Sequence, residues 1–125
     1  MKTIINTPNA PAPIGPYNQA VMVNGTLYVS GQIGIDPAIG KVVEGDVTVQ
    51  AKQVMKNLEN ILKAAGMDFS NVVKTSIFLS DMKDFPKVNE IYGSFFKADP
   101  PARETVQVGA LPMFVDVEIS CIAVK

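Results

Sequence analysis

Apolar residues recur three and four positions apart between residues 51 and 65, which predicts an amphipathic α-helix. The residues that share this face are Ala51, Val54, Met55, Leu58, Ile61, Leu62 and Ala65. Asp46 precedes the segment as a candidate N-cap, and Gly66 follows it as a candidate terminator. A helix with one apolar face must bury that face against another layer, so the pattern predicts packing on a β-sheet.

A second helix is predicted to begin at Asp84, with Pro86 in its first turn, and to end at Asp99-Pro100-Pro101. Its apolar face would hold Val88, Ile91, Tyr92, Phe95 and Phe96. Runs rich in β-branched and aromatic residues predict strands at 17–23, 26–30, 72–79, 103–108 and 115–124. Asn24-Gly25 separates the first two strands and is typical of a type I′ hairpin turn. The order of elements favours an α+β fold with two helices on one face of a mixed sheet.

Alternation within the last two strands assigns their side chains to faces of that sheet. Glu118 stands among apolar residues that should meet the helices, so Glu118 is expected on the opposite face. In the preceding strand Val106 is expected to meet the helices, which would place Arg103 and Thr105 on the same face as Glu118. We expect the two strands to pair antiparallel, with Thr105 beside Glu118 and Arg103 one diagonal step away.

Two interpretations of Arg103 and Glu118 follow from this placement. They could form an ordinary cross-strand ion pair on a solvated sheet. However, the same face carries Ile122 and Val124, so we expect it to be covered by association with other chains. Association would bury both charges, and a buried charge needs a partner. Arg103 could then bind a small carboxylate, while Glu118 orients a water or moves a proton.

Composition restricts the chemistry further. The 125 residues are expected to form one domain, 1–125, and they contain no histidine, which nearly excludes a metal site or a histidine-based triad. A net charge of −1 without a basic stripe argues against nucleic acid as a partner. The single cysteine, Cys121, is expected in the core of a protein from a reducing compartment. Without an apolar run of membrane-spanning length or a signal-peptide core, we expect a cytoplasmic protein without a membrane partner.

Six short motifs, taken in order, make the chain resemble the Rid family of reactive imine deaminases, also called YjgF-like proteins. The motifs are NAPAPIGPY at 9–17, SGQI at 30–33, DMKDF at 81–85, VNEIYG at 88–93, PAR at 101–103 and VEI at 117–119. Together they extend over essentially the whole chain.

The resemblance implies a chorismate-mutase-like α+β fold and a homotrimer with a central β-barrel and three clefts between subunits. The implied activity is hydrolysis of 2-imino acids or their 2-enamine tautomers to 2-keto acids and ammonium. Such substrates include 2-iminopropanoate, 2-iminobutanoate and 2-aminoacrylate. Their removal protects pyridoxal-phosphate enzymes, and the reaction needs no cofactor and no metal.

By the same resemblance, Arg103 holds the substrate carboxylate and Glu118 acts on the attacking water. The other positions that match the family's cleft are Tyr17, Ser30, Gly31, Phe85, Asn89 and Thr105. A glutamate ordinarily titrates at about 4.3, so we expect Glu118 to orient the water unless burial raises its pKa.

The chain departs from the common family pattern at three places. Thr105 replaces a frequent cysteine, Gly109-Ala110 replaces a segment that often carries a basic residue, and Ser120 replaces a frequent glutamate. A trimer that senses a small carboxylate without turnover is the alternative function. A ribonuclease role ranks last, because the chain lacks histidine and a basic groove.

Overall fold

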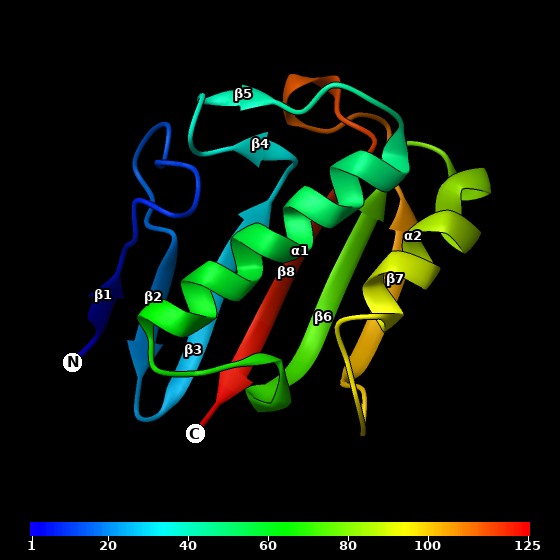
Figure 1. Ribbon diagram of the computed structural model, residues 1–125. Helices are drawn as coiled ribbons and strands as arrows, with labels where there is room; N and C mark the ends of the chain where they lie inside the picture. Colours follow the sequence, from blue (N-terminus) through cyan, green and yellow to red (C-terminus); the bar gives the residue numbers. More distant parts are fainter.

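The computed structural model describes all 125 residues, and Figure 1 shows two α-helices on one face of a β-sheet. The helices are α1 (Val47–Ala64) and α2 (Phe85–Gly93). The six-stranded sheet has the order β1-β2-β3-β8-β6-β7, formed by β1 (Thr3–Ile5), β2 (Ala20–Val23), β3 (Thr26–Gln32), β8 (Val117–Val124), β6 (Val72–Leu79) and β7 (Ala102–Gln107). A separate ribbon pairs β4 (Ile35–Asp36) with β5 (Lys41–Val42). The predicted α+β class, with two helices on one face of a mixed sheet, is confirmed.

The predicted hairpin joins β2 and β3, with Val23 opposite Thr26. Asn24 and Gly25 between them have φ values of 49° and 79°, as a type I′ turn requires. The short edge strand β1 pairs with β2, and the hydropathy pattern did not predict it. The proline-rich arm between β1 and β2 contains no regular element, because prolines at positions 8, 11, 13 and 16 interrupt backbone hydrogen bonding.

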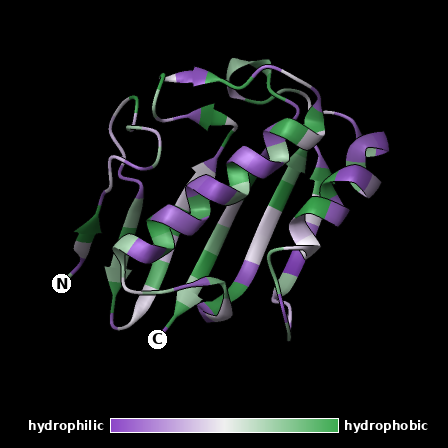
Figure 2. Ribbon diagram, in the orientation of Figure 1, coloured by the Kyte–Doolittle hydropathy of each residue, from purple (hydrophilic) through white to green (hydrophobic).

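The first helix has the predicted limits and caps. The Asp46 side chain accepts hydrogen bonds from the backbone amides of Thr48 at 3.0 Å and Val49 at 3.3 Å. Gly66 follows the helix with a φ of 72°, a left-handed conformation that suits glycine. Figure 2 shows the polar residues of α1 on the side turned away from the sheet. Neither helix is long and apolar enough to cross a membrane.

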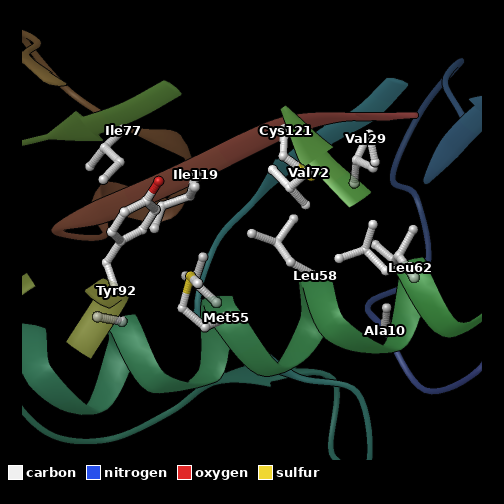
Figure 3. Close-up of a cluster of buried hydrophobic side chains, with 14 of the residues drawn as sticks. Ala10, Val29, Met55, Leu58, Leu62, Val72, Ile77, Tyr92, Ile119 and Cys121 are labelled. Carbon is white, nitrogen blue, oxygen red and sulfur yellow. The ribbon is translucent and has the colours of Figure 1, made fainter. Parts of the chain in front are cut away.

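The hydrophobic core fills the space between α1 and the sheet. Figure 3 shows side chains of α1 pointing toward the strands, with Met55, Leu58 and Leu62 facing Val29, Val72, Ile119 and Cys121. Cys121 is buried in this layer, as predicted. The arm contributes Ala10, which is only 2% exposed, so the arm is anchored to the core.

The second helix is shorter than predicted, because it ends at Gly93. Phe95 and Phe96 lie beyond its end and pack edge-to-face on Phe69, with ring centres 5.5 Å and 5.3 Å away. Gly93 and Ser94 have weak helix propensity, and the two phenylalanines reach an apolar partner without further helical turns.

The pairing predicted for the last two strands is wrong. β7 runs parallel to β6, with Arg103 opposite Thr75 and Thr105 opposite Ile77. β8 lies between β3 and β6, antiparallel to both. The reason is that β6, α2 and β7 form a β-α-β unit, in which the helix returns the chain to the same end of the sheet.

The face of the sheet away from the helices is covered by no element of the chain (Figure 1). Large apolar side chains on this open face are 41 to 51% exposed, among them Ile4, Tyr28, Val106 and Val124. Val106 was expected to meet the helices, but it lies opposite Phe78 on the open face. The open face is therefore as apolar as the pattern predicted.

Candidate active site

Arg103 extends from β7 toward α2, on the side of the sheet that the helices cover. Its Nη1 donates a hydrogen bond to Asn89 Oδ1 at 2.7 Å. Its Cζ lies 5.3 Å from the ring centre of Phe85 and 5.1 Å from that of Tyr92. These cation–π contacts fix the plane of the guanidinium, while the side chain stays exposed. We call Phe85, Asn89, Tyr92 and Arg103 the Arg103 cluster; three of its members were predicted site residues.

Tyr92 was predicted only as part of an apolar helix face. Its hydroxyl shares a 2.7 Å hydrogen bond with Thr75 Oγ1, and burial raises the pKa of Tyr92. Tyr92 is thus a neutral, fixed ring beside Arg103. Spacing was the available signal, because Phe85, Asn89 and Tyr92 are separated by four and three positions and so share one helix face.

Thr105 lies two residues after Arg103 on the same face of β7. Its Oγ1 is the only buried side-chain nitrogen or oxygen atom in the chain without a hydrogen-bond partner. Buried hydroxyls are nearly always paired. Thr105 can therefore offer a hydrogen bond to a group that the chain itself does not supply.

Glu118 lies in a separate pocket with a volume of about 380 Å³, which is within the range of small-molecule sites. Tyr17 of the arm, Gly31 of β3 and Glu118 of β8 line it, together with apolar side chains that include Ile14, Ile33 and Met113. We call this cavity the Glu118 pocket. It brings together three of the predicted site residues.

Gly31 permits a close approach between the β3 backbone and the Glu118 carboxylate. A Cβ atom at position 31 would lie 2.4 Å from Glu118 Oε2 and 2.8 Å from Cδ. The backbone of Gly31 does not have a positive φ, so a turn does not explain the glycine. A glycine is needed at position 31 because the Glu118 carboxylate occupies the space that a side chain there would take.

Burial raises the pKa of the Glu118 carboxyl above its ordinary value, because the charged form is penalised. No cation lies within salt-bridge distance of this carboxylate. A carboxyl group in a pocket with a raised pKa is a candidate general base.

Gln19, which the sequence analysis did not single out, lines the Glu118 pocket and holds the arm there. Its Oε1 accepts from Thr7 N at 2.7 Å, and its Nε2 lies 3.0, 3.2 and 2.9 Å from the carbonyl oxygens of Thr7, Ala10 and Pro11. Its side chain is only 2% exposed, so these bonds are shielded from water. No sequence pattern distinguishes this glutamine, because its burial and its partners are set by the fold.

Ser30 also contacts the arm, since its hydroxyl donates to Asn18 O at 2.6 Å. It does not line the Glu118 pocket. A role of Ser30 in ligand contact stays a prediction.

The expectation that Arg103 and Glu118 share a face is wrong. Arg103 lies opposite Thr75 and Glu118 opposite Phe78, three residues farther along β6 and on the other face. Two strand spacings separate the two backbones by about 10 Å across the sheet, and three residue rises separate them by about 10 Å along the strands. A small ligand therefore cannot contact both residues of one chain.

The available groups can bind an anion and transfer a proton. Arg103 supplies a cation, Thr105 a free hydroxyl and Glu118 a carboxylate. No group of three or more cysteine, aspartate or glutamate side chains is arranged to bind a metal ion.

Known proteins of one family match this chain over nearly its whole length. A family model described as "Endoribonuclease L-PSP" matches residues 7–125. A mouse protein named 2-iminobutanoate/2-iminopropanoate deaminase is 55% identical over 125 residues, which are 100% of this chain and 93% of the mouse protein. YyfA of the Rid protein family from Yersinia pestis superposes with a TM-score of 0.98 and 47% identity over 100% of both chains. The structure of E. coli TdcF with bound serine superposes with a TM-score of 0.94 and 40% sequence identity over 98% of each chain.

Proposed function

Because this chain belongs to the Rid (YjgF-like) family, whose model is described as Endoribonuclease L-PSP, we propose that it hydrolyses 2-imino acids and their 2-enamine tautomers. The products are 2-keto acids and ammonium. The predicted family and deaminase activity are confirmed by full-length relatives with that name, including those of mouse and human. The substrates are 2-iminopropanoate, 2-iminobutanoate and 2-aminoacrylate, and their removal protects pyridoxal-phosphate enzymes.

The separation of Arg103 from Glu118 is the observation that most strongly supports a site between chains. Each chain carries one half of the required chemistry, the Arg103 cluster on one side of the sheet and the Glu118 pocket on the other. Closed assembly would bring the cluster of one chain to the pocket of the next. We propose a homotrimer of one-domain chains (1–125) with a chorismate-mutase-like fold, three such clefts and a central barrel lined by the apolar open faces.

In this cleft the substrate carboxylate binds Arg103 through two charge-assisted hydrogen bonds. Asn89 and Phe85 hold the guanidinium in place. The unpaired hydroxyl of Thr105 donates to the same carboxylate. The bound serine in TdcF, a small amino acid with a carboxylate, supports a ligand of this class.

The substrate's C2 atom then lies at the Glu118 pocket, with Tyr17 as a wall and the Gly31 backbone close to the ligand. Water adds to C2 of the protonated imine, forming a C–O bond, while the C=N π electrons move to nitrogen. Glu118 accepts the proton that the water loses and returns it to the nitrogen. The C–N bond then breaks as the C=O bond forms, and the departing ammonia takes the proton of the carbinolamine hydroxyl and leaves as ammonium.

The raised pKa of Glu118 supports one of its two possible roles. A carboxylate with an ordinary pKa would mainly orient the water, as the sequence favoured. Burial brings the proton affinity of Glu118 closer to neutrality, so we assign it the role of general base.

Two other functions are compatible with parts of the molecule. A sensor that binds a small carboxylate without turnover would use Arg103 in the same way, and the serine bound to TdcF favours such binding. The family description mentions an endoribonuclease, but the chain has no histidine and a net charge of −1. We therefore propose no nucleic-acid partner, while the cytoplasmic location and the lack of a membrane partner stay predictions from the sequence.

The test generates 2-aminoacrylate in situ with a serine or threonine dehydratase and follows keto-acid release. Wild type should accelerate release, and Arg103→Ala and Glu118→Ala should each abolish the acceleration. If wild type gives no acceleration but still binds a carboxylate ligand in calorimetry, the hydrolase hypothesis is rejected in favour of the sensor.

Mixing the two inactive variants tests the site between chains. In trimers reassembled from equal amounts of Arg103→Ala and Glu118→Ala chains, about a quarter of the clefts would carry both wild-type residues. Recovery of roughly that share of activity is expected. Recovery of none would contradict a shared cleft.

A further inference from the structure

Met113 and Phe114 form the tip of the loop between β7 and β8, and both have left-handed backbones with φ values of 55° and 53°. Glycine or asparagine adopts this conformation easily, whereas larger side chains are strained in it. Buried Leu111 and Val115 anchor the loop on either side. Hydrogen bonds from Phe114 N to Leu111 O at 2.9 Å and from Val115 N to Pro112 O at 3.3 Å close it. The fold thus imposes the conformation, and the chain retains two bulky residues in it.

The two residues differ in what their side chains contact. Met113 lines the Glu118 pocket, whereas Phe114 does not line it and is 87% exposed. Strained backbone at a ligand site is a reason to look for a function there. The strain is common to both residues, so only the pocket contact of Met113 points to a role in binding.

Met113 belongs to an apolar wall of the Glu118 pocket that also contains Ile33 and Ile35. Glu118 and the Gly31 backbone, to which the imine carbon is assigned, share the pocket with the polar side chains of Gln19 and Gln32. A substrate held there would direct its side chain toward apolar surface. Methionine suits this position, because its flexible thioether adapts to side chains of different shape.

The volume of the pocket exceeds what the smallest substrates need. At about 30 Å³ for each water-sized group, a volume of about 380 Å³ holds on the order of a dozen heavy atoms. An alanine-derived imino acid has about half that number, and a leucine-derived one about three quarters. Space next to the apolar wall therefore remains when a three-carbon substrate is bound.

We propose that Met113 determines substrate specificity, by extending the pocket so that the enzyme favours 2-imino acids with apolar side chains of four carbons. This inference rests on the proposed imine hydrolysis and names the substrate class for the same cleft. The ligand side chain packs against Met113 and Ile33, while its carboxylate binds Arg103 of the neighbouring chain.

The experiment compares imines that an L-amino-acid oxidase forms in situ from L-leucine and from L-alanine. Rates are measured in competition with semicarbazide, at equal imine supply, for wild type, Met113→Gly and Phe114→Gly. Both substitutions place glycine at a left-handed position, so both relieve the same kind of strain. Phe114→Gly is the matched control, because only Met113 lines the pocket.

Wild type should show a higher kcat/KM for the leucine-derived imine. Met113→Gly should lower the leucine-to-alanine ratio of kcat/KM about tenfold, as expected for lost apolar contact in a pocket. Phe114→Gly should keep the wild-type ratio. A wild type without preference, or equal ratios in wild type and Met113→Gly, would overturn the role of Met113 while leaving imine hydrolysis intact.

A wild type inactive on both imines would refute the proposed function, and binding would then decide the inference. Calorimetry with pyruvate and 4-methyl-2-oxopentanoate measures the same selectivity without turnover. Tighter binding of the longer keto acid, lost in Met113→Gly and kept in Phe114→Gly, would support the specificity role. Equal affinities would refute it.

Discussion

Replacing Gly31 by alanine should displace the Glu118 carboxylate while leaving the fold intact. The new Cβ would lie 2.4 Å from Oε2, 2.8 Å from Cδ and 3.1 Å from Cγ of Glu118. Real Cβ contacts shorter than 3.0 Å essentially do not occur, so Oε2 must retreat by at least about 0.6 Å. The displaced atoms are the end of a flexible side chain, and the Gly31 backbone suits any residue. The strain can therefore be relieved without moving the sheet.

The expected effect is large on catalysis and small on stability. Misplacing a reacting group by about 1 Å costs on the order of 100-fold in rate, so kcat of Gly31→Ala should fall by about 10- to 100-fold. Unfolding free energy should change by about 1 kcal/mol or less, because a half-buried side chain can adopt another rotamer.

The assay measures keto-acid release from in-situ 2-aminoacrylate, together with urea unfolding and sedimentation. Binding of pyruvate by calorimetry separates lost chemistry from lost affinity. Wild-type kcat in Gly31→Ala would refute the need for this Glu118 position. Loss of the assembly would instead show that Gly31 is required for packing between chains. In that case the bulkier Gly31→Val should lose the assembly as well.

Three further predictions concern protonation, the arm and the single thiol. Burial raises the pKa of Glu118 above its unfolded value, so its charged form destabilises the fold as pH rises through the folded pKa. Glu118→Gln should therefore raise Tm relative to wild type at pH 8 but not at pH 4. The acid limb of the wild-type kcat/KM profile should lie above the ordinary glutamate range. Equal Tm differences at both pH values would contradict this. Gln19→Leu should lower the free energy of unfolding in urea by about 2 to 4 kcal/mol, because it removes a buried hydrogen-bond network. The control Asn60→Leu removes one exposed hydrogen bond to Asn9 and should cost about 1 kcal/mol or less. Similar losses in the two variants would show that the Gln19 network is not stabilising. Burial raises the pKa of Cys121 to about 12, so maleimide should label it only after unfolding, and rapid labelling of the native protein would refute its burial.

The amino-acid sequence by itself determined the local elements and the chemistry of the site. The span and caps of α1, the Asn24-Gly25 turn and the limits of β6 follow from interactions between residues close in sequence. The six short motifs in order identified the family, and the resemblance implied the reaction class, to which an anion-binding arginine and a carboxylate are suited.

Only the tertiary structure decided how these parts meet. Strand order depends on contacts between distant residues, and alternation within one strand does not say which neighbour it pairs with. The β-α-β crossover placed β7 parallel to β6, which put Arg103 on the helix side and left Glu118 on the other. The roles of Gln19 and Met113 likewise arise from packing between segments far apart in the chain, where sequence periodicity carries no information, whereas helical spacing alone could have placed Tyr92 beside Phe85 and Asn89.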